Sequence, residues 1–143
     1  MSAVASFHVL DRVHVPALLR APHEVPRTLG RVAGDYHWSG YCIVHLVEYL
    51  GDLGITLYES EYDRDLAELD DDAPFTVLIT PAHKRFLPYL DPVAHSEADI
   101  AAHFEEAQYA FEEAGTAGRE GIALLRDGIT ALTDDEVLVV QVC

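Results

Sequence analysis

Three segments of the chain carry the hydrophobic pattern of β-strands. In SFHVL, residues 6–10, apolar and polar positions alternate, so Phe7 and Val9 share one face. FTVLIT, residues 75–80, and EVLVVQV, residues 136–142, are nearly continuous apolar runs rich in β-branched residues, which is typical of buried strands. ITLYES, which follows Gly54, alternates more weakly and predicts a further strand.

Other apolar segments repeat with the helical period of about 3.6 residues. One helix is predicted from about residue 40 to 50, capped by Ser39. A short helix follows Thr80 and ends or kinks at Pro88. A longer amphipathic helix begins after Ser96 and ends by about residue 117. Its apolar stripe consists of Ile100, Phe104, Ala107, Phe111 and Ala114.

The remaining segments have less regular patterns. Residues 14–21 predict a short helical turn, and residues 22–35, with two prolines and two glycines, predict a loop. Residues 61–74 are strongly acidic and predict a loop with room for one helical turn. Residues 118–132 are ambiguous between helix and strand. Since glycine costs about 1 kcal/mol inside a helix, we favour a strand at residues 122–126.

Together these elements predict the fold class. A chain of 143 residues, half of them hydrophobic, fits one domain with a substantial core, spanning residues 1–143. The order of strands and helices predicts an α+β fold. The sheet would be mixed or mostly antiparallel, with helices packed on one face.

Charge is distributed unevenly along this chain. The net charge is −16, yet acidic and basic residues balance within residues 1–50, so the whole excess lies in residues 51–143. A negative surface repels phosphate groups, which argues against nucleic acid and anionic membranes as partners. The charge then serves solubility, a basic protein partner or cations, and a small molecule is the other partner considered.

The compartment is predicted from what the sequence lacks. The first ten residues have no basic segment ahead of the apolar run, and no charge-free run reaches the ~20 residues that span a bilayer. Two cysteines do not make a disulfide framework. We therefore expect a cytoplasmic protein.

The helix near residues 40–50 holds the densest candidate chemistry. One of its faces gathers Tyr41, His45, Glu48, Tyr49 and Asp52, with Cys42 at the border. In an enzyme, His45 would be a general acid and base oriented by Glu48. Alternatively, the face packs under a loop and makes structural hydrogen bonds, with Cys42 as a small buried hydrophobe. The sequence thus leaves open whether residues 36–50 line a pocket or form part of the core.

No cofactor or metal motif stands out. Asp99, His103 and Glu106 share a helix face, but there is no HExxH motif or pair of CxxC motifs, and the acidic segment lacks calcium-loop spacing. We predict neither a metal nor a cofactor.

Three segments resemble the YfbM-like family of small bacterial α+β proteins of unknown function. They are GDYHWSGYCIVHLVEYLG, residues 34–51; VLITPAHKRFLPYL, residues 77–90; and IAAHFEEAQYAFEEAGTAGREGIALLRDG, residues 100–128. Position 37 is His, where the family usually has Lys before the tryptophan. The resemblance implies an α+β fold and a strand after Gly121, and it implies no reaction.

Two functions follow as hypotheses. The first is an acidic binding or regulatory protein, similar to an immunity protein, whose partner is basic. The alternative is a small cofactor-independent enzyme acting on a small organic substrate by proton transfer. Its catalytic residues would be His37, Tyr41, His45 and Glu48, with Trp38, Cys42 and Tyr49 in binding roles.

Overall fold

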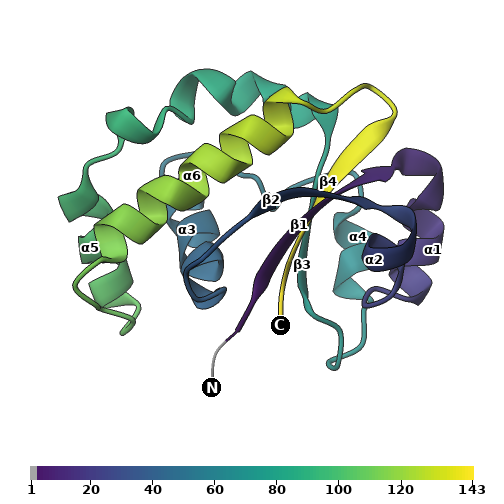
Figure 1. Ribbon diagram of the computed structural model, residues 1–143, viewed down its shortest axis with the longest axis horizontal. Coiled ribbons are helices and arrows are strands. Elements are labelled where there is room, and N and C mark those ends of the chain that lie inside the picture. The colour runs from purple at the N-terminus through teal and green to yellow at the C-terminus, as the bar shows by residue number, and fades with distance from the viewer. Residues whose placement is uncertain (1–2) are drawn as a thin grey trace.

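In the computed structural model, which describes residues 3–143, an antiparallel sheet separates two groups of helices (Figure 1). The strand order is β2-β1-β4-β3, with the two long strands in the middle. The strands are β1 (Ala5–Asp11), β2 (Arg31–Asp35), β3 (Phe75–Ile79) and β4 (Glu136–Val142). The predicted α+β class and the predicted strands at residues 6–10, 75–80 and 136–142 are confirmed.

The longer helices cover one face of this sheet. They are α3 (Tyr41–Asp52), α5 (Glu97–Glu106) and α6 (Ala114–Thr130), and all three lie to the left of β1, β3 and β4 in Figure 1. They bury the face of β1 that carries Phe7 and Val9. This is the larger core of the molecule, and it follows from the alternation read in the sequence.

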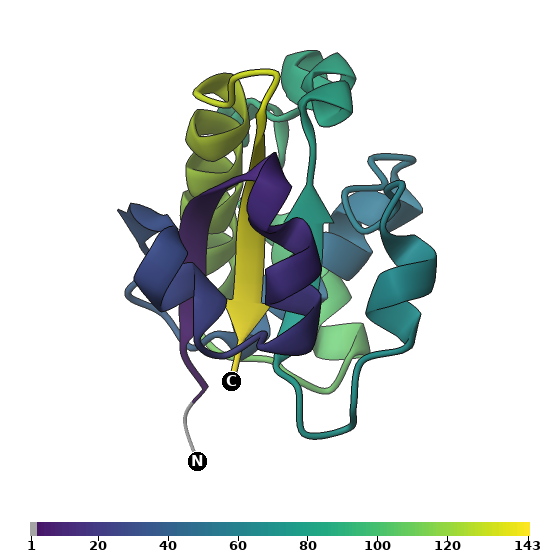
Figure 2. The same cartoon turned by 90° about the vertical axis from the view of Figure 1, so that its right-hand side faces the viewer.

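Short helices cover the opposite face, so helices are not confined to the one face that the sequence predicted. These are α1 (Val15–Arg20), α2 (Val25–Leu29) and α4 (Asp63–Ala67); in Figure 2, α1 and α2 lie in front of the strands and α4 lies to the right of them. A smaller core joins Leu10, Val137 and Val139 of the sheet to Val15 and Leu18 of α1. Both faces of β4 are therefore buried, which explains its continuous apolar run.

The connections between helices and strands contain 3-10 turns. These are η1 (Arg12–His14), η2 (Pro81–Tyr89) and η3 (Pro92–Ala94). The predicted helix after Thr80 is thus present as the 3-10 helix η2, which contains Pro88. Within residues 3–143, no helix combines the length and apolar character that crossing a membrane requires.

Two predictions about short segments are wrong. Residues 55–60 form turns and irregular backbone rather than a strand. Ile55 and Leu57, whose apolar side chains suggested the alternation of a strand, are buried by a tight local turn after α3. In that turn the Ile55 N–H donates to the Leu50 carbonyl at 2.9 Å. Residues 22–35 are not a loop, since they contain α2 and the edge strand β2.

The predicted strand at residues 122–126 is also wrong, since these residues lie inside α6. Its glycines lie where the helix presses on its neighbours. A Cβ at Gly115 would lie 2.5 Å from Cβ of Glu97, and one at Gly121 would lie 2.6 Å from Cδ2 of Leu46. The packing that glycine permits outweighs its low helix propensity. The helix predicted to run to residue 117 instead ends at Glu106, and α6 begins at Ala114.

Candidate functional site

The histidine singled out by the sequence, His45, packs against the aromatic side chains of Phe104 and Tyr109. Its ring centroid is 5.8 Å from that of Phe104 and 5.1 Å from that of Tyr109. Nδ1 lies 3.6 Å from Oε2 of Glu48, too far for a hydrogen bond, and has no other partner among the described residues. Only 20% of the side chain is exposed, so the imidazole is largely covered.

Tyr49, on the same helix, makes a structural hydrogen bond. Nε2 of His95 lies 2.7 Å from the Tyr89 carbonyl and must donate to it, so Nδ1 accepts from the Tyr49 hydroxyl at 3.0 Å. Burial raises the pKa of Tyr49 above its ordinary value. The bond ties α3 to the segment before α5.

His103 joins this interface from α5. Its ring centroid lies 5.7 Å from that of Tyr49, and its Nδ1 lies 3.6 Å from Oδ2 of Asp52. Asp99 and Glu106, its expected neighbours on the helix, are exposed. In the described part of the chain, no three His, Cys, Asp or Glu residues are arranged to hold a metal ion.

Trp38 and Cys42 meet the 107–113 loop at a cavity of about 300 Å³, which we call the aromatic cavity. Its lining residues are Trp38, Ser39, Cys42, Tyr109, Ala110 and Phe111. The centroid of Phe111 lies 6.2 Å from that of Trp38 and 5.7 Å from that of Tyr109. Three mutually inclined aromatic rings therefore line one concavity.

Hydrogen bonds hold the segment before α3, which includes the cavity residue Trp38, to α6. The Tyr36 hydroxyl donates to the Ala117 carbonyl at 2.7 Å, and Nε1 of Trp38 donates to a carboxylate oxygen of Glu120. Burial raises the pKa of Cys42, so the thiol at the cavity stays protonated at neutral pH. A protonated thiol is a weak nucleophile.

The other predicted site residues do not line this cavity. His37 and Glu48 are exposed, and His45 is covered by aromatic rings. Tyr41 does not line the cavity but contacts two residues that do: its ring centroid lies 6.1 Å from that of Tyr109, and its backbone N–H donates to Oγ of Ser39 at 3.3 Å. Of the seven residues singled out by the sequence, the fold brings Trp38 and Cys42 into one concavity.

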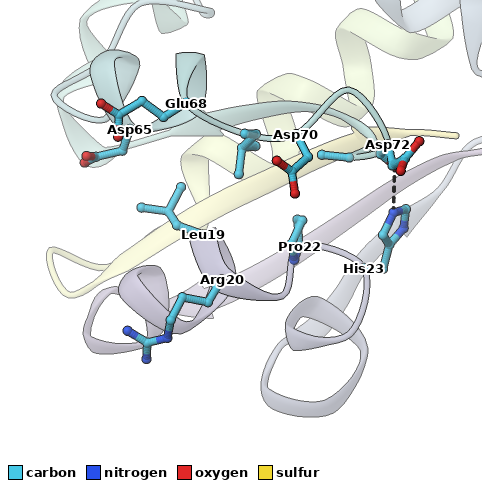
Figure 3. Close-up of a pocket in the computed structure, with 10 residues that line it drawn as sticks. Leu19, Arg20, Pro22, His23, Asp65, Glu68, Asp70 and Asp72 are labelled. Carbon is cyan, nitrogen blue, oxygen red and sulfur yellow. Dashed lines mark hydrogen bonds between the residues drawn. The ribbon is translucent and has the colours of Figure 1, made fainter.

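A second concavity lies on the opposite face of the sheet, between α1 and the α4–β3 loop (Figure 3). It has a volume of about 340 Å³, and we call it the acidic groove. Its polar residues are Asp65, Glu68, Asp70, Asp72, Arg20 and His23, and its apolar residues are Leu19, Pro22, Leu69 and Ala73.

The carboxylates of the acidic groove are free to meet a ligand. The side chains of Asp65, Glu68, Asp70 and Asp72 have no hydrogen-bond or ion-pair partner within residues 3–143. His23 closes one end, where its ring nitrogen lies 3.1 Å from the Asp72 carbonyl (Figure 3). A further hollow of about 500 Å³ shares Leu19 and Asp65 and extends the groove along α1 toward Arg12.

The sequence indicated the acidic side of this groove and missed its other wall. The run of carboxylates in residues 61–74 is visible in the sequence, but α1 carries no signal that it would lie opposite. Tyr109 and Ala110 were missed at the aromatic cavity for a similar reason. They lie in the break between α5 and α6, and the sequence shows no sign of this break because the apolar stripe of the predicted helix runs through it.

Comparisons with protein-family models, with curated proteins and with solved structures found no match to this chain. The resemblance to the YfbM-like family stays a prediction.

Proposed function

We propose that the protein is an acidic binding protein whose acidic groove takes a basic segment of a protein partner. The observation that carries this proposal is the set of four unpaired carboxylates around a concavity with an apolar lining. Arginine and lysine have apolar stems and charged ends, so they suit such a groove. The net charge of −16 would also attract a basic partner from a distance.

The alternative, an acid–base enzyme centred on His45, has less support. Proton transfer requires the base to reach the substrate at hydrogen-bond distance. His45, Glu48 and His37 are not among the residues that line the aromatic cavity, and the His45 ring packs against Phe104 and Tyr109.

The test uses a synthetic peptide of alternating arginine and alanine, titrated calorimetrically against the full chain. A peptide with citrulline in place of arginine keeps the shape and hydrogen bonding but loses the charge. We expect saturable binding of the arginine peptide that weakens as salt is raised, because exposed charges are screened. Equal binding of the citrulline peptide would contradict the proposal.

Matched variants locate the binding surface. The triple variant Asp65→Asn, Glu68→Gln, Asp70→Asn should weaken peptide binding about tenfold, since each exposed charge pair contributes up to ~1 kcal/mol. The control Glu105→Gln, Glu106→Gln, Asp134→Asn removes the same charge from exposed positions elsewhere. If both variants lose the same affinity, net charge rather than the groove is responsible.

A further inference from the structure

We propose that the aromatic cavity is a binding site for a small organic cation that carries a methylated ammonium group. The cavity lies on the α3, α5 and α6 face of the sheet, whereas the acidic groove lies on the other. The proposal is therefore independent of the partner proposed for the groove. At about 300 Å³, the aromatic cavity is at the small end of the ~300–1,000 Å³ range of ligand pockets.

The aromatic rings supply the attraction. A cation within about 6 Å of a ring centroid is drawn to the negative face of the ring, most strongly for tryptophan. Phe111 is inclined at 40° to Trp38 and at 76° to Tyr109, so the three rings bound the cavity in different orientations. Centroid separations of 6.2 Å and 5.7 Å allow one cation to approach more than one of them.

The charges around the cavity favour a cation. Glu120 accepts a hydrogen bond from Nε1 of Trp38, which holds a carboxylate at the edge of this ring. Glu112 and Glu113 follow Phe111 and are exposed. No lysine or arginine lines the cavity, and the nearby Arg119 is engaged with the His95 carbonyl at 2.8 Å and with Glu97.

The chemistry of the lining selects the kind of cation. A metal ion or a primary ammonium needs oxygen atoms to replace its water, and Ser39 offers the only side-chain oxygen in the lining besides the Tyr109 hydroxyl. Cys42 lies behind this lining as a fully buried, small apolar side chain and adds no polar group to it. A quaternary ammonium has no N–H groups to satisfy, so it can leave water for an aromatic lining at little cost.

Trp38 makes the test direct, since it is the chain's one tryptophan. Its fluorescence is titrated with choline and with 3,3-dimethylbutan-1-ol, the neutral isostere of choline. We expect a saturable change with choline and at least about tenfold weaker binding of the alcohol. If the two bind equally, the cavity is only an apolar pocket, and if choline produces no saturable change there is no site; either result overturns the proposal.

Two variants assign the effect to the rings. Phe111→Leu keeps an apolar side chain and should lower choline affinity about fivefold, which is the contribution expected of one aromatic face. Tyr89→Leu removes an exposed ring elsewhere, with 60% of the residue exposed, and should leave choline affinity unchanged. Equal affinities of the two variants would overturn the assignment. The comparison of choline with its isostere in the unaltered chain does not depend on the folding of either variant.

Discussion

The two faces of the sheet are built in different ways. On one face, α3, α5 and α6 press closely on each other through glycines and bury most of the core. On the other, α1, α2 and α4 are short, bury a small cluster, and carry the groove with its unpaired carboxylates. Stability therefore resides mainly on the first face, while the second can hold charges that repel one another at little cost in stability.

The largest contrast should come from removing one buried leucine on each face. Leu46→Ala, in the larger core, should lower the free energy of unfolding by about 3–5 kcal/mol, because α3 and α6 cannot collapse into the cavity. Leu18→Ala, in the smaller core, should lower it by about 2–3 kcal/mol, because the short α1 can shift. Urea denaturation measures both values. A larger loss for Leu18→Ala would reverse the comparison of the two faces.

The glycine contacts predict the next effect. Alanine normally stabilises a helix relative to glycine by about 0.5–1 kcal/mol. At Gly115 the added Cβ would lie 2.6 Å from the Glu97 carbonyl oxygen, which is backbone and cannot rotate away. Gly115→Ala should therefore lower the free energy of unfolding by about 1–3 kcal/mol. The exposed neighbouring change Thr116→Ala should not, and urea denaturation compares them. A stabilised Gly115→Ala would mean that α5 and α6 are not closely packed there.

The glycines of α6 also show which parts of the fold can be predicted from the sequence and which cannot. Strands β1, β3 and β4 and helix α3 follow from local periodicity, since each buries a face that the sequence displays, although the N-cap of α3 is Gly40 rather than the predicted Ser39. Helix α6 does not, because the reason for Gly115 and Gly121 is the surface of another helix, which local patterns cannot contain. The candidate site divides in the same way. Trp38 and Cys42 were found from one local segment, the start of α3 and the residues just before it, whereas Tyr109 comes from the distant loop between α5 and α6.

A buried histidine in η2, His83, makes stability depend on pH. Nε2 of His83 donates to the Glu59 carbonyl at 2.7 Å, so its Nδ1 accepts from the Thr80 N–H at 3.0 Å. Burial lowers the pKa of His83 below the ordinary 6.5. As the pH falls through 6.5, the unfolded chain takes up the proton first, and stability is lost toward lower pH.

The loss should reach at most about 1.4 kcal/mol per pH unit from this group. His83→Gln keeps a donor for the Glu59 carbonyl and should reduce the slope of unfolding free energy between pH 7 and 5. His37→Gln removes an exposed imidazole and serves as the control. An unchanged slope in His83→Gln would show that other groups, such as His8, whose pKa is also lowered by burial, account for the dependence.

The smallest effect should come from the carboxylates of the acidic groove. Glu68 and Asp70 are exposed and unpaired in a chain of net charge −16, so Glu68→Gln with Asp70→Asn should raise the free energy of unfolding. The gain should be no more than about 0.5 kcal/mol at low salt and should vanish near 1 M salt, where the screening length is about 3 Å. Urea denaturation at the two salt concentrations measures it. A loss of stability would instead indicate that these carboxylates support the α4–β3 loop, and the groove would then be part of the fold rather than a surface kept free for a basic partner.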